Sequence, residues 1–212
     1  MEQDQAAAFF RVLYTTRALR RLKPDPVPEE LLFQLVDAAI RAPSGQNAQD
    51  WRFVVVTDPA IKSLMQTAAT EAWARYQPRF AAEPSLMDEL PRTKRLSLKA
   101  TAHLAHHVGE APAVILVCGL KARHSSPGGS AFPSVQNLLL AARAAGLGAA
   151  LVTMPLWSTF LARRALGLPW NVSPCAVVPL GWPIGRYGPT TRRPVGDVVH
   201  VDRYGNRPWR KS

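Results

Sequence analysis

Residues 42–56 read A-P-S-G-Q-N-A-Q-D-W-R-F-V-V-V and contain a polar loop followed by a strand. A proline and a glycine interrupt regular structure in the loop, whereas Trp51–Thr57 is rich in aromatic and β-branched residues, as strands are. Ser44 and Asn47 add hydrogen-bond donors and acceptors. Such a loop suits a flat heterocycle with donors and acceptors along one edge. It equally suits an ordinary turn whose side chains bond to the backbone.

Helical and strand patterns alternate along the rest of the chain. Apolar residues at helical spacing, with breakers at the ends, predict helices at Phe9–Thr16, Glu29–Arg41, Ala60–Arg75, Leu96–Gly109, Val135–Ala145 and Ser158–Leu166. Apolar and β-branched runs predict strands at Trp51–Thr57, Ala113–Cys118, Ala149–Thr153, Cys175–Gly181 and Val198–Val201. Three prolines and mixed polarity in Gln77–Pro91 predict a mobile excursion rather than a domain linker. The chain is therefore expected to be one domain, residues 1–212, of the α/β or α+β class.

Composition excludes several kinds of protein. The chain has 212 residues, of which 47% are hydrophobic and 19% charged, so it can bury one sizeable core. Its two cysteines exclude a disulfide-rich scaffold. Uncharged stretches at 144–162 and 165–185 are interrupted by glycines and prolines, so neither predicts a membrane helix. The first residues are acidic and polar, so no signal peptide is expected, and a soluble, cytoplasmic protein is the resulting prediction.

Positive charge is concentrated at the two ends of the chain. The formal charge is +11, and residues 1–23 and 183–212 together carry most of it. This excess favours a solvated basic surface, a small anionic ligand or nucleic acid. Aromatic residues are not interleaved with the basic ones and no zinc-finger spacing occurs, which disfavours nucleic acid.

Two polar clusters are candidates for ligand binding. Arg17, Arg20 and Arg21 offer guanidinium forks suited to phosphate, or they form a solvated helix end. Gln136 and Asn137 interrupt an apolar helix near its start. They need hydrogen-bond partners there, whether in a ligand, in a helix cap or in the protein interior.

Other chemistries lack support in the sequence. His103, His106, His107 and Glu110 lie at helical spacing, but one helix cannot surround a tetrahedral metal ion. A polar helix face is expected there instead of a metal site. The sequence contains no G-x-S-x-G elbow, no P-loop and no complete dinucleotide-binding glycine motif.

Four motifs, taken in order, resemble the nitroreductase family of flavin enzymes. They are T-T-R-A-L-R-R-L-K-P-D-P-V-P from Thr15, A-P-S-G-Q-N-A-Q-D-W-R-F-V-V-V from Ala42, Q-N-L-L-L-A-A-R-A-A-G-L-G from Gln136, and P-L-G-W-P-I-G from Pro179 with R-R-P-V from Arg192. Any one of them is weakly specific, whereas four in the family's order are strongly so. The resemblance covers nearly all of the chain outside residues 71–103 and the last few residues.

The resemblance implies an α+β sandwich with a central, mainly antiparallel sheet, assembled as an intertwined homodimer. FMN would lie in clefts at the dimer interface, with its phosphate near basic residues from both ends of the chain. The partner chain's loop would approach the ring, and Leu151–Pro155 resembles the stretch that lies against it. The implied cofactor-binding residues are Arg17, Arg20, Arg21, Pro43, Ser44, Gly45, Asn47, Thr153, Met154, Arg192 and Arg193. No catalytic side chain and no metal site are implied.

Two further segments acquire roles from the resemblance. Residues 71–103 resemble a variable, lid-like region above the active site. Their large apolar residues would either form a lid or pack in a core: Trp73, Tyr76, Phe80 and Met87. The basic tail, residues 183–212, is expected to wrap around the partner subunit.

The implied activity is oxidoreduction by a ping-pong mechanism. NADPH or NADH would supply hydride, and a nitroaromatic, a quinone or a related small molecule would accept electrons. Neither nucleic acid nor a membrane is expected as a partner. The alternative is a flavin-binding or flavin-processing protein of the same fold without general NAD(P)H reductase activity. Thr16-Arg17-Ala18 stands where the family often has Arg-Arg-Ser, so phosphate contacts can shift to Arg20, Arg21 or the tail.

Overall fold

A four-stranded antiparallel sheet forms the centre of the computed structural model, which describes residues 2–120, 129–153, 163–164 and 166–210. The strands are β1 (Trp51–Val56), β2 (Ala113–Leu120), β3 (Gly148–Ala149) and β4 (Val172–Gly181), in the order β1-β2-β4-β3. Each neighbouring pair is antiparallel. The predicted α+β class and antiparallel sheet are therefore confirmed.

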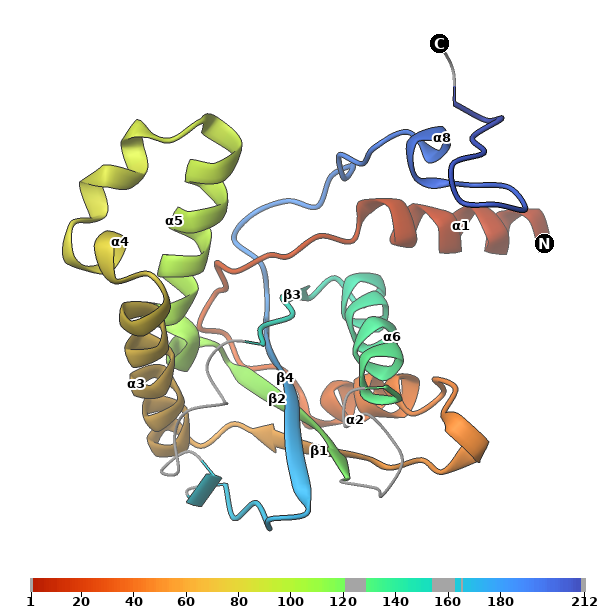
Figure 1. Cartoon of the computed structure of the whole chain (residues 1–212). Coiled ribbons are helices and arrows are strands. Elements are labelled where there is room, and N and C mark those ends of the chain that lie inside the picture. Colours follow the sequence, from red (N-terminus) through yellow and green to blue (C-terminus); the bar gives the residue numbers. More distant parts are fainter. Residues whose placement is uncertain (1, 121–128, 154–162, 165, 211–212) are drawn as a thin grey trace.

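The central strand β2 is buried on both faces of the sheet. Its sequence A-V-I-L-V-C carries no charge, and successive side chains point to opposite faces. Ile115 and Val117 join the core shared with α2 (Glu29–Ala39) and α6 (Ala131–Ala144). Val114 and Leu116 join the core on the other face, under α3 (Pro59–Tyr76) and α5 (Arg92–His107). The sheet is thus covered by helices on both sides (Figure 1).

The remaining helices are short or peripheral. Three of them are α1 (Glu2–Thr15), α4 (Pro78–Ala82) and α8 (Val195–Val198). Short 3-10 helices occur as η1 (Gly45–Asn47), η2 (Pro84–Glu89) and η3 (Val108–Glu110). Among the described residues, no helix combines the length and the apolar character needed to cross a bilayer.

The segment expected to be a mobile excursion, Gln77–Pro91, contains α4 and η2. Trp73 and Met87 are almost fully buried in a small core of their own, against which Phe80 packs. Burial of these side chains offsets the helix-breaking effect of the prolines, each of which stands at a first helical turn or beside one. Two of the four candidate lid residues are therefore core residues, whereas Tyr76 is exposed.

The two ends of the described chain lie side by side. The amide of Lys23 donates to the carbonyl of Trp182 over 2.7 Å. The amide of Ile184 donates to the carbonyl of Arg21 over 3.1 Å. Further along, the amide of Thr190 donates to the carbonyl of Tyr14. We call this set of bonds between residues 14–23 and 182–190 the terminal ladder (Figure 1). The first part of the basic tail thus pairs with its own chain, and wrapping of a partner by the rest stays a prediction.

The predicted strand at Val198–Val201 is wrong. Helix α8 ends at Val198, and the amide of Val201 donates to the carbonyl of Asn206 in a local turn. Pro194 stands just before the helix, where its fixed φ favours a helical start. The β-branched run meets no sheet edge among the described residues, so its strand propensity has nothing to pair with. Most of the predicted helix Ser158–Leu166 lies outside the described residues.

Gly181→Ala is expected to destabilise the fold by about 1–3 kcal/mol, because a Cβ there would lie 2.7 Å from the rigid ring of Pro112. Equilibrium denaturation in urea measures the change in the free energy of unfolding. Gly188→Ala is the matched control, since nothing lies within 4 Å of a Cβ at that position. Equal stabilities of the two variants would contradict the close packing.

Candidate functional site

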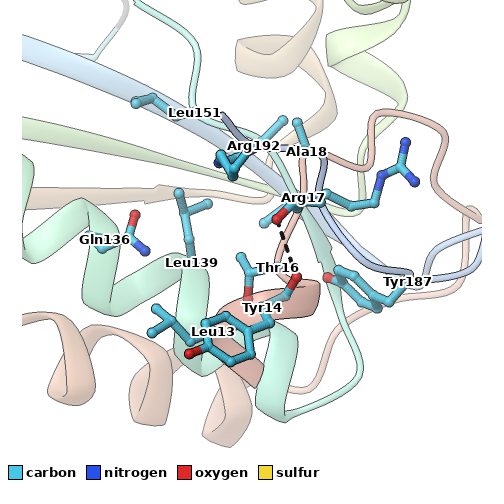
Figure 2. A pocket seen from close by; sticks show the side chains of 13 residues that line it. Leu13, Tyr14, Thr16, Arg17, Ala18, Gln136, Leu139, Leu151, Tyr187 and Arg192 are labelled. Carbon is cyan, nitrogen blue, oxygen red and sulfur yellow. Dashed lines mark hydrogen bonds between the residues drawn. The ribbon is translucent and has the colours of Figure 1, made fainter. Parts of the chain in front are cut away.

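A cavity of about 460 Å³ lies where the residues after α1 meet α6, the residues after β3 and the C-terminal segment (Figure 2). It is lined by Leu13, Tyr14, Thr16, Arg17, Ala18, Gln136, Leu139, Ala149, Ala150, Leu151, Tyr187, Thr190 and Arg192. The terminal ladder brings these segments together, since Thr190 Oγ1 also donates to the carbonyl of Tyr14 over 3.2 Å. The size of the cavity is within the range of small-molecule sites.

One part of the cavity wall is cationic. Arg17 and Arg192, from opposite ends of the chain, both line it and are both exposed. Neither guanidinium has an ion-pair partner in the part of the chain that the structure describes. A neighbouring cavity of about 320 Å³ adds Arg20 to the same pair. Burial lowers the pKa of Arg20, although a guanidinium stays protonated in proteins. The three arginines form a cationic wall.

The rest of the cavity wall is largely apolar. Leu13, Leu139 and Leu151 contribute hydrocarbon surface, and Gln136 contributes an amide from the first half of α6. Its neighbour Asn137 instead donates from Nδ2 to the carbonyl of Ala38 over 3.3 Å. Of the two polar residues in this apolar helix, one therefore faces the cavity and the other ties α6 to α2.

Tyr187 also lines the cavity, and it was not predicted from the sequence. Its hydroxyl donates to the carbonyl of Leu147, and the guanidinium of Arg143 lies 4.2 Å from the centre of its ring. Arg143 Nε also donates to Thr15 Oγ1 over 3.1 Å, which links α6 to the end of α1. Burial raises the pKa of the Tyr187 phenol, and the charge of Arg143 opposes that rise. The only sequence signal was a tyrosine, one of two in a tail rich in glycine and proline.

The loop residues predicted to approach a flavin do not line this cavity. Pro43, Ser44, Gly45 and Asn47 lie in and before η1, between α2 and β1. Asn47 adopts a left-handed backbone conformation with φ 54°, as do its neighbours Gln46 and Gln49. Within one chain, the structure does not bring this loop to the arginines.

Side-chain bonds hold that loop in shape. Ser44 Oγ accepts from the amide of Gln49 over 3.1 Å, and Gln49 Nε2 donates to Asn47 Oδ1 over 3.1 Å. Left-handed conformations in residues other than glycine cost roughly 1–2 kcal/mol each, and such strain is concentrated at functional sites. The loop therefore presents its amides in a fixed and unusual arrangement.

The other predicted residues are placed as follows. Thr153 is exposed two residues beyond the cavity-lining Leu151, and Met154 lies outside the described residues. Arg193 is exposed and does not line the cavity, although its neighbour Arg192 does. Arg21 lines a different cavity, near α5. Within the described ranges, no three His, Cys, Asp or Glu side chains are placed to hold a metal ion.

Comparisons with known proteins agree with this architecture. The profile of the nitroreductase family matches residues 13–182, so the chain belongs to the nitroreductase family. A protein of Thermus thermophilus named NADH dehydrogenase is 34% identical over 188 residues, which are 86% of this chain and 90% of that one. The resemblance drawn from the four motifs is confirmed, and the chain is an oxidoreductase of this family.

Two further matches are more distant, one in sequence and one in structure. An iodotyrosine deiodinase of Danio rerio is 28% identical over 190 residues, which are 85% of this chain and 61% of that protein. The FMN-dependent nitroreductase NfnB of Mycobacterium smegmatis, solved in complex with NADPH, aligns with a TM-score of 0.71 at 20% identity. That alignment covers 94% of this chain and 100% of NfnB, and it shows the likeness of the fold alone.

Tyr187→Phe is expected to lower the free energy of unfolding by about 1–3 kcal/mol, because the buried carbonyl of Leu147 loses its donor. Urea denaturation checks this, with the exposed Tyr76→Phe as control. Because the folded-state pKa is raised, this contribution is complete below about pH 10 and decreases as pH rises through the folded-state pKa. A difference between wild type and variant that grows above pH 10 would contradict the assignment.

Proposed function

We propose that the cavity between Arg17 and Arg192 binds FMN, and that the protein uses NADPH or NADH to reduce small electron acceptors. The observation that carries the proposal is that two arginines from opposite ends of the chain line one largely apolar cavity and have no ion-pair partner among the described residues. FMN has the matching chemistry, since it joins a phosphate dianion to a flat, largely apolar ring. The expected acceptors are nitroaromatics, quinones or related compounds.

The residues present fit FMN. Arg17 and Arg192 would hold the phosphate, with Arg20 from the adjoining cavity, because planar guanidiniums pair with phosphate oxygens in a bidentate way. The ring would lie against the leucines of the wall, and Gln136 would hydrogen-bond to its polar edge. Arg21 is less suited to the phosphate, since it lines a separate cavity. Arg193 and the stretch at Thr153 and Met154 stay candidates for contacts in the assembled protein.

A second copy of the chain would complete the site. Helix α1 exposes Phe9, Phe10 and Tyr14, and the side chain of Phe9 also lines an apolar cavity of about 520 Å³ between α1, α2 and α6. Apolar surface of this kind marks interaction sites, and two-fold self-association is the commonest way to cover it. In such a homodimer, the loop with Pro43, Ser44, Gly45 and Asn47 would reach the cavity of the other copy. The tail beyond residue 192 would lie against that copy.

The chain's own residues supply binding and electrostatics. When bound, FMN supplies the redox chemistry by taking hydride from a nicotinamide and passing electrons to an acceptor. Arg17 and Arg192 would neutralise the phosphate, and the amides of Gln136 and Asn47 would donate to the polar edge of the ring and stabilise negative charge there. Donor and acceptor would occupy the same pocket in turn, which gives ping-pong kinetics. No side chain is assigned a proton-transfer role.

The visible spectrum of the purified protein tests the function first. Flavin absorption that bleaches under anaerobic NADPH or NADH, and returns with a nitroaromatic, a quinone or 3-iodo-L-tyrosine, is the expected result and identifies the acceptor class. Flavin bands that persist with either nicotinamide would favour a flavin-binding protein without reductase activity. A protein that takes up no FMN would overturn the proposal.

Arg17→Gln is expected to weaken FMN binding by about tenfold to a hundredfold, which corresponds to one charge-assisted hydrogen bond. Asn47→Ala is expected to weaken it about fivefold, for one neutral bond. Fluorescence titration of FMN measures both, with the exposed Arg186→Gln and Asn171→Ala as controls. Because Asn47 does not line the cavity of its own chain, its effect requires the second copy. Unchanged affinity in both variants would refute the site.

A further inference from the structure

A second, smaller cavity lies where residues 20–22 approach the end of α5. Its volume is about 130 Å³, well above the roughly 10–15 Å³ that one water molecule requires. The lining residues are Arg20, Arg21, Leu22, His103, Leu104, His107, Val108, Glu110, Ala111, Pro179 and Ile184. The function proposed above makes no use of Arg21 or of the two histidines.

The charges around this cavity are not balanced. Arg20 and Arg21 contribute two permanent positive charges, and no ion-pair or hydrogen-bond partner of either guanidinium is found in the described part of the chain. The one carboxylate, Glu110, accepts from Nδ1 of His107 over 2.9 Å. Arg20 is half-buried, where a positive charge without an anion beside it is unfavourable, whereas Arg21 is exposed at the rim of the cavity.

The histidines add charge that depends on pH. The rings of His103 and His107 stack with their centres 4.3 Å apart. Burial, followed by the nearby His107 ring and Arg21, holds the pKa of His103 below its usual value, while Glu110 opposes that shift. An anion in the cavity would reverse the effect of the positive neighbours and favour the protonated rings. Occupancy and protonation are therefore coupled.

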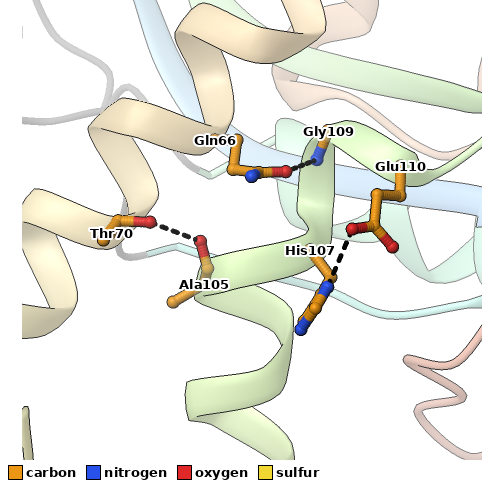
Figure 3. Close-up of polar contacts among 6 residues, drawn as sticks. All are labelled: Gln66, Thr70, Ala105, His107, Gly109 and Glu110. Atoms are coloured by element: carbon orange, nitrogen blue, oxygen red, sulfur yellow. Dashed lines mark hydrogen bonds and ion pairs between the residues drawn. The ribbon is translucent and has the colours of Figure 1, made fainter.

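Both walls of the cavity are held in place. On the α5 side, Thr70 Oγ1 donates to the carbonyl of Ala105 over 3.0 Å. The amide of Gly109 donates to Gln66 Oε1 over 3.2 Å. Figure 3 shows these bonds to α3 on one side of α5 and η3, and the His107–Glu110 pair on the other side. The Arg21 side is fixed by the terminal ladder. A rigid site of this kind loses little entropy when a ligand binds.

We propose that this cavity binds a small tetrahedral oxyanion of the sulfate or phosphate type. Arg20 and Arg21 provide fixed charge, His103 and His107 provide ring N–H donors, and apolar residues such as Leu104 and Val108 form the rest of the lining. Glu110 stays paired with His107. Binding is accompanied by proton uptake, so affinity rises as pH falls. Arg20 is shared with the phosphate site of the proposed function, so in the FMN-loaded protein Arg21 and the two histidines carry the binding of the oxyanion.

Titration with sulfate tests the proposed oxyanion site. The titration uses the FMN-loaded protein, or the protein as purified if it holds no FMN. Sulfate is the probe because its charge does not change between pH 5.5 and 8. The ring signals of His103 and His107 are followed by NMR at constant ionic strength. We expect saturable shifts in the signals of these two histidines alone. Above the histidine pKa, the affinity for sulfate is expected to fall about tenfold per pH unit for each proton taken up on binding.

Variants locate the binding. Arg21→Gln and His107→Gln are each expected to weaken sulfate binding about tenfold. Arg186→Gln and the exposed His106→Gln, on the same helix as His107, are expected to leave it unchanged. Should Arg21→Gln fail to fold, His107→Gln carries the test. Shifts that do not saturate, that are independent of pH, or that are abolished by Arg17→Gln but not by Arg21→Gln would overturn the proposal.

A competition identifies the natural source of the oxyanion. If 2′,5′-ADP displaces sulfate at a lower concentration than inorganic phosphate does, the group belongs to a nucleotide. If inorganic phosphate is the stronger competitor, the ligand is a free anion. Either order supports the site, whereas displacement by neither would contradict it.

Discussion

Backbone hydrogen bonds between residues 14–23 and residues 182–190 hold the two ends of the described chain together, and both cavities depend on them. They place Arg17 beside Arg192, and Arg21 beside the end of α5. Each bond contributes about 1 kcal/mol on its own. Their register is maintained by packing, since Leu22 fits against Gly148 and Gly181, where any side chain would collide with it.

The sheet provides the rigid frame to which this ladder is attached. Its buried centre separates α2 and α6 from α3 and α5, so each cavity has a wall made by a different helical layer. The larger cavity uses α6, and the smaller one uses α5 and η3. Positive charge near the chain ends is thereby gathered into two local cationic surfaces.

The elements that were predictable are those whose pattern is local. Strand β2 and helices α2 and α3 followed directly from apolar runs and periodicity. The strand predicted at Val198–Val201 is absent because β-branched residues form a strand only where a sheet edge is available. The helices within Gln77–Pro91 were not predicted, because the benefit of burying Met87 against Trp73 cannot be seen in the segment itself.

The site was partly predictable for a related reason. The type of residue was clear, since clustered arginines in a chain with this excess of positive charge suggest an anion. Which arginines converge depends on pairing between segments at opposite ends of the sequence, and no local pattern encodes that register. The supporting role of Tyr187 under Arg143 depends on the same pairing and was missed.

The ladder also has a consequence for biosynthesis. Residues 14–23 leave the ribosome early, whereas their hydrogen-bond partners follow β4, the last strand of the sheet. At roughly 5–20 residues per second, translation of residues 24–181 takes about 8–30 s. During that interval the early segment has exposed amides and carbonyls and no native partner, as an unpaired sheet edge does. The nascent chain therefore passes through a period in which chaperones and other strands can compete for this segment, and the cavities form only after the competition ends.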